Sequence, residues 1–84
     1  MSDEEFDVLD ELYFVTSYHE LKSNLEWSTD ELVPVLSVLY KKGLIRVLFG
    51  VDKEVPEEQV SLLTDFDNYH YLASKKGLLA HNSK

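Results

Sequence analysis

Histidine is the side chain best suited to acid–base or metal chemistry near neutral pH, and this chain has three. His19, His70 and His81 lie far apart and lack the His-x-x-x-His spacing that places two ligands on one helix face. The chain has no cysteine, and its three glycines form no phosphate-binding loop. The sequence therefore predicts no metal site, no cofactor and no cysteine nucleophile.

Neighbouring carboxylates are the other possible source of chemistry. They occur as Asp3 to Glu5, Asp10 to Glu11, and Glu57 to Glu58. These pairs fall at expected helix starts and surface positions, and a carboxylate in the first turn stabilises a helix through its dipole. We interpret them as surface groups, and no residue of the chain points to an enzyme.

The composition is typical of one folded domain covering residues 1–84. Hydrophobic residues make up 44% of the chain and ten residues are aromatic, although the net charge is -8. A chain this short buries roughly 60–65% of its unfolded surface, so neither a large pocket nor a small-molecule substrate is expected. The N-terminus does not resemble a signal peptide, and no apolar run approaches the ~20 residues that span a bilayer. These features predict a cytoplasmic protein without a membrane partner.

The elements that must position any functional residue begin with three helices. Each follows a Ser-x-x-Glu capping signal and carries apolar residues at helical spacing. The predicted helices span residues 3–15, 17–25 and 29–42. Gly43 is expected to form a left-handed C-cap after the third helix. Pro34 removes a backbone hydrogen bond, so we expect either a kink there or a later helix start.

The second half of the chain predicts two strands, at residues 44–49 and 69–73, joined by a long acidic connection at residues 52–68. Tyr69 and Tyr71 alternate with His70 and Leu72, so the two tyrosines should share one face of the sheet. Ser74 is expected to cap a last helix of about eight residues, before a polar tail that starts at His81.

This order resembles that of winged-helix transcriptional regulators of the MarR, ArsR and PadR kinds. The residues that carry the resemblance are Leu39, Gly43, Leu44 and Ile45, then Tyr69 or Tyr71, Leu72, Ser74, Lys76 and Gly77. Ala73 and Ser74 depart from the usual Thr arrangement, and one extra lysine precedes the glycine. The resemblance implies a small α+β fold with a three-helix helix-turn-helix core, a two-stranded β-hairpin wing and a short C-terminal helix.

The resemblance also implies that the helix at residues 29–42 enters the major groove of DNA. The side chains available for DNA contact are Lys41, Lys42, Arg46, Lys75 and Lys76. Residues 52–68, however, carry six acids against one lysine, and acidic groups repel phosphates. Residues 28–33 offer no Arg, Lys, Asn or Gln to contact a base edge. A DNA-binding regulator acting as a dimer is therefore the alternative hypothesis.

The first hypothesis is a non-catalytic interaction module that binds a protein partner, or a second copy of itself, through acidic and apolar surfaces. A connection as long as residues 52–68 is unusual between paired strands and tends to be functional or disordered. The candidate apolar anchors are Trp27, Leu62, Leu63 and Phe66. Each of these side chains has a second interpretation, which is packing in the core.

Overall fold

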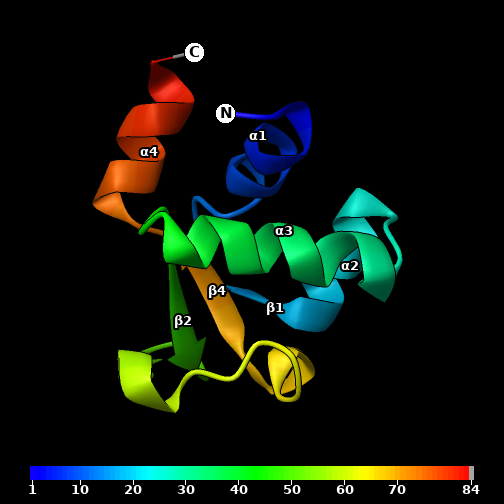
Figure 1. Ribbon diagram of the computed structural model, residues 1–84, viewed down its shortest axis with the longest axis vertical. Helices are drawn as coiled ribbons and strands as arrows, with labels where there is room; N and C mark the ends of the chain where they lie inside the picture. The colour runs from blue at the N-terminus through cyan, green and yellow to red at the C-terminus, as the bar shows by residue number, and fades with distance from the viewer. Residues whose placement is uncertain (84) are drawn as a thin grey trace.

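A computed structural model describes residues 1–83 and shows an α+β fold, with four α-helices beside an antiparallel sheet of four strands (Figure 1). The helices and strands, in chain order, are α1 (Asp3–Asp10), β1 (Thr16–Ser17), α2 (Tyr18–Leu25), α3 (Thr29–Lys41), β2 (Ile45–Phe49), β3 (Lys53–Glu54), β4 (His70–Ala73) and α4 (Lys75–Asn82). Two 3-10 turns, η1 (Glu57–Gln59) and η2 (Phe66–Asn68), lie in the connection between β3 and β4.

Serine caps start all four helices, as the capping signals predict. The Ser2, Ser17 and Ser28 hydroxyls accept hydrogen bonds from the backbone amides three residues later, at 3.1–3.2 Å. Ser74 does the same for α4, over 3.0 Å to the amide of Gly77. These bonds satisfy amides that have no partner within the helix.

The first helix is shorter than predicted, because α1 ends at Asp10 and not near residue 15. The chain leaves the helix so that β1 can pair with β4, with Thr16 opposite Tyr71. The amide of Ala73 also donates to the carbonyl of Leu12 over 2.9 Å. Tertiary pairing therefore overrides the apolar stripe that continues to Val15, and a strand of two residues leaves almost no signal in the sequence.

Pro34 does not delay α3, which begins at Thr29 and continues through the proline, so the expectation of a later start is wrong. The helix ends as predicted at Gly43, whose φ is 75°. The amide of Leu44 donates to the carbonyl of Leu39 over 2.9 Å, which is the closing bond of a Schellman motif. This turn leads the chain directly into β2.

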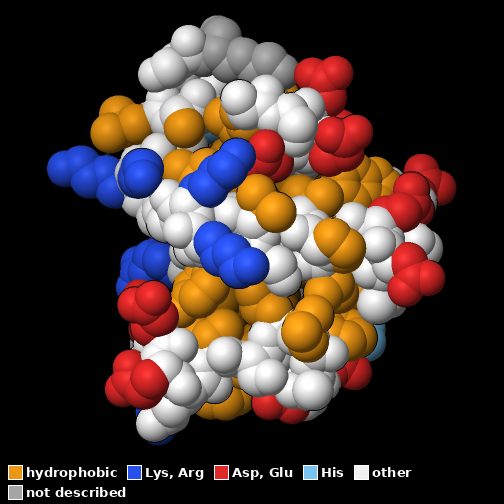
Figure 2. Space-filling model, in the orientation of Figure 1, with side chains coloured by type: hydrophobic (Ala, Val, Ile, Leu, Met, Phe, Trp, Pro, Cys, Tyr) orange, Lys and Arg blue, Asp and Glu red, His pale blue; other side chains and the backbone are white. Residues whose placement is uncertain are grey.

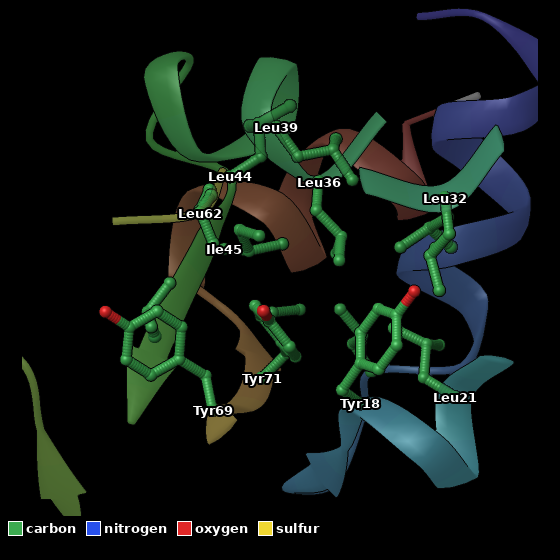
Figure 3. Packing of buried hydrophobic residues seen from close by; sticks show 14 of the residues in the cluster. Tyr18, Leu21, Leu32, Leu36, Leu39, Leu44, Ile45, Leu62, Tyr69 and Tyr71 are labelled. Atoms are coloured by element: carbon green, nitrogen blue, oxygen red, sulfur yellow. The ribbon is translucent and has the colours of Figure 1, made fainter. Parts of the chain in front are cut away.

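The sheet has the strand order β1-β4-β2-β3, so the predicted pair of strands forms its centre. Ile45 lies opposite Ala73, and Val47 lies opposite Tyr71. The predicted alternation is confirmed, since Tyr69 and Tyr71 are buried while His70 and Leu72 are partly exposed. The rings of Tyr18, Tyr69 and Tyr71 lie below the leucines of α3 in the core (Figure 3).

The last helix has eight residues, as predicted, and starts after the Ser74 cap, but it includes His81 and ends at Asn82, so the assignment of His81 to a tail is wrong. The imidazole of His81 stacks on the ring of Phe6, with 4.1 Å between ring centroids. Its Nδ1 lies 2.7 Å from the Tyr13 hydroxyl. His81 is therefore part of the contact between α4 and α1, which lie side by side in Figure 1, and the last residue of the predicted tail lies outside the described residues.

Gly77 brings α4 against the turn between α3 and β2. A Cβ atom at this position would lie 2.0 Å from the carbonyl oxygen of Leu44, which already accepts from the amide of Ser74. The close approach explains why a glycine stands in the first turn of a helix.

Gly77→Ala should therefore lower the free energy of unfolding by about 3 kcal/mol, which corresponds to a fall in Tm of roughly 12 °C or more for a domain of this size. Leu79→Ala, at an exposed position of the same helix, is the matched control and should change the stability by less than about 0.5 kcal/mol. Equal melting temperatures for the two variants would contradict the packing of α4 described above. Thermal unfolding followed by circular dichroism measures both.

Candidate interaction surface

The long connection between β3 and β4 is held against the domain by two buried tyrosines. The amide of Ser61 donates to the Tyr69 hydroxyl over 3.0 Å, and the Tyr71 hydroxyl donates to the carbonyl of Phe66 over 2.7 Å. Burial raises the pKa of Tyr71, so its hydroxyl keeps the proton that it donates. Residues 60–66 therefore have a fixed place beside α3.

An apolar groove of about 600 Å³ lies between α3 and this connection. Its walls are Val33, Pro34, Ser37, Val38, Tyr40 and Lys41 on α3, and residues 60–63 on the connection. The side chain of Leu63 is 82% exposed and that of Val38 is 42% exposed. Figure 2 shows the face that carries this groove, with hydrophobic side chains in a band below α3. Two large aliphatic side chains therefore face solvent in one hollow.

Carboxylates lie near one end of this groove. Burial raises the pKa of the Tyr40 hydroxyl, and the carboxylates of Glu57, Glu54 and Glu58 raise it further. Glu57 and Glu58 belong to η1 and are exposed, and acidic side chains border the hydrophobic band at its lower edge in Figure 2. The groove is thus apolar inside, with acids at its rim on the side of the connection and Lys41 on the side of α3.

The four predicted apolar anchors have different positions. Leu63 lines the groove with its side chain exposed, whereas Leu62 is only 8% exposed and belongs to the core. Phe66 is half-buried, with its ring centroid 5.0 Å from that of Tyr18. Trp27 is half-buried and lies away from the groove, beside Asp3, Glu4, Asp7 and Glu31. Of the four predicted anchors, Leu62 and Leu63 therefore line the groove, and Leu63 is the exposed one.

Three groove residues, Val33, Pro34 and Val38, were not among the predicted anchors. Pro34 and Val38 are four residues apart and share one face of α3, the exposed face, while Leu32, Leu36 and Leu39 are buried. The signal was a valine and a proline on a helix face where charged residues are the rule. That signal can be found in a sequence only after the buried face has been assigned.

The five predicted DNA-contact residues are all exposed. Lys and Arg side chains gather at one side of the face in Figure 2, over the end of α3 and the start of α4. Lys42 Nζ lies 2.8 Å from a carboxylate oxygen of Glu5, and Arg46 Nε lies 2.5 Å from one of Glu54. Lys76 Nζ donates to the carbonyl of Lys42 over 2.9 Å. Three of the five cations therefore have a partner within the domain.

Glu5 is a nearly buried carboxylate that joins α1 to the end of α3. Its Oε1 accepts from the amide of Ser2, and its Oε2 accepts from Lys42. The hydrogen bond from Lys42 is the largest cause that lowers the pKa of Glu5 below its ordinary value of 4.5; burial opposes this shift, and the bonds from Ser2 add to it.

Within residues 1–83, no group of three or more His, Cys, Asp or Glu side chains is placed to hold a metal ion. None of the helices in this part of the chain has the length and apolar character needed to cross a membrane. Comparison of the sequence with protein-family models, with curated proteins and with solved structures finds no match.

The lowered pKa of Glu5 gives the pH dependence of stability a definite sign. The stabilisation is present above the unfolded-state pKa and is lost as the pH falls through the lower pKa of the folded state. Glu5→Gln keeps the capping geometry but removes the charge, so it should lower the free energy of unfolding at pH 7 by about 1 kcal/mol. The difference from wild type should shrink below pH 4.5.

Urea unfolding at several pH values between pH 7 and pH 3 measures this difference. Glu4→Gln removes the neighbouring exposed carboxylate and is the control. A loss of stability in Glu5→Gln that stays constant down to pH 3 would show that the ion pair with Lys42 is not its cause.

Proposed function

We propose that this domain is a non-catalytic interaction module of the winged-helix class, which binds a segment of another protein in the groove between α3 and residues 60–63. The order of helices and strands, with β1 and β4 paired and a long connection before β4, supports the winged-helix assignment. In that arrangement, α3 is the recognition helix and the connection is the wing.

The observation that carries the proposal is the chemistry of the exposed face of α3. A helix that contacts base edges needs Arg, Lys, Asn or Gln there. This face has Pro34, Ser37 and Val38, with a single cation, Lys41, at its C-terminal end, and Leu63 of the wing extends it. Adjoining apolar side chains in a concave surface are typical of sites that bind protein segments.

DNA binding is the second candidate, and a specific observation favours it. Lys41, Lys75 and Lys76 are exposed, and no carboxylate of residues 1–83 forms an ion pair with them. Two copies of the domain would bring six such cations together. The acidic wing beside α3 opposes this function, because it would lie against the phosphates.

A selection from a random peptide display library against the immobilised domain tests the proposal. We expect peptides that bind wild type saturably and bind Val38→Glu at least about tenfold more weakly, because the substitution places a charge inside the apolar contact. Leu79→Glu makes the same change at an exposed leucine of α4 and should bind as wild type does.

Peptides that bind both variants equally would contradict the groove as the binding site. Salt-sensitive binding of labelled duplex DNA, lost in Lys75→Glu with Lys76→Glu and kept in Val38→Glu, would establish the second candidate in its place. Circular dichroism of each variant confirms that the fold is retained.

A further inference from the structure

We propose that the occupant of the groove is a basic, apolar-anchored segment of another protein: one or two bulky apolar side chains inserted between α3 and residues 60–63, flanked by Lys or Arg that face the acidic rim. This inference rests on the proposed function and specifies the chemistry of its partner.

The length of the groove limits the segment. Its wall on α3 extends from Val33 to Lys41, which at 1.5 Å per residue is about 12 Å. That distance corresponds to about four residues of extended chain or about eight residues of helix. Val38 and Leu63 stand on opposite walls, so an apolar side chain between them contacts both.

The charges around the groove determine which charge is favourable on the residues that flank the anchors of the bound segment. The connection is one side: Glu57 and Glu58 come shortly before its groove-lining residues 60–63, in a segment, residues 52–68, that has six acids against Lys53. The other side, the α3 wall from Val33 to Lys41, has Lys41 as its one charged side chain. The attraction therefore comes from the connection, and a segment with Lys or Arg beside its anchors gains it when those cations face Glu57 and Glu58.

The same charge argues against a second copy of this chain. A second copy has a net charge of -8 and the same acidic wing. A two-fold pairing through the groove would bring Glu57 and Glu58 of each copy close to the acids of the other. Such a pairing would cover the exposed Leu63 of each copy but would place like charges together, which costs free energy at an interface.

The test uses the peptides from the display selection that lose affinity for Val38→Glu, because those are the groove binders. We expect them to be rich in Lys and Arg beside a Leu, Ile, Phe or Trp. Binding of the synthetic consensus peptide should weaken at least about fivefold in Glu57→Lys with Glu58→Lys, and should weaken with added salt. A peptide in which Lys and Arg are replaced by Glu should prefer that charge-reversed variant.

The control is Glu4→Lys with Asp7→Lys, which changes the net charge equally on α1, outside the groove. Equal weakening in this control would show that net charge, and not the rim, attracts the peptide, and would overturn the inference.

The remaining outcomes separate the two proposals. Groove-binding peptides that are neutral or acidic, and that bind the Glu57→Lys with Glu58→Lys variant as they bind wild type, would overturn the inference of a basic partner. The proposal of an interaction module would then still stand. A library without any Val38-dependent peptide would overturn both. A dimer seen by sedimentation that dissociates in Val38→Glu would identify a second copy as the occupant and overturn the inference.

Discussion

The position of the long connection between β3 and β4 depends on the hydroxyls of two buried tyrosines. Tyr71 of β4 and Tyr69, the residue before that strand, are buried in the domain, and each makes a hydrogen bond to the connection that precedes the strand. A buried hydroxyl without a partner costs free energy, so these bonds fix residues 61–66 at the same time as they satisfy the tyrosines. The groove exists because this segment is held at a distance from α3 that leaves Val38 and Leu63 uncovered.

The helix α3 therefore has two apolar faces with different roles. Leu32, Leu36 and Leu39 are fully buried against the tyrosines and the sheet (Figure 3). Pro34 and Val38 are exposed to solvent, so their apolar side chains add nothing to the core of the isolated domain. Charged residues at those two positions would make the domain more soluble at no cost in packing. We infer that contact with a partner is the reason why these two positions are apolar, and that the acidic connection beside them favours a positively charged partner.

Much of the fold could be predicted from the sequence, because its strongest signals are local. Serine caps, the left-handed Gly43 and the alternation of Tyr69 and Tyr71 depend on a few neighbouring residues, and all were predicted correctly. The errors lie where distant segments meet: α1 ends early so that β1 can pair with β4, and His81 belongs to a helix because it stacks on Phe6. Leu62 and Leu63 were candidate anchors in the sequence and both line the groove, but the outer face of α3 could be assigned to it only once the connection was placed beside that helix.

Amide hydrogen exchange at Ser61 tests most directly whether the tyrosines hold the connection between β3 and β4 beside α3. In wild type, the Ser61 amide should be protected, because its hydrogen bond goes to a buried hydroxyl. In Tyr69→Phe, the exchange of Ser61 should accelerate at least about tenfold while the amides between β2 and β4 keep their protection. Tyr13→Phe, which removes an exposed hydroxyl elsewhere, should leave Ser61 unchanged. A Ser61 amide that exchanges freely in wild type, or equally slowly in Tyr69→Phe, would contradict the origin of the groove proposed here.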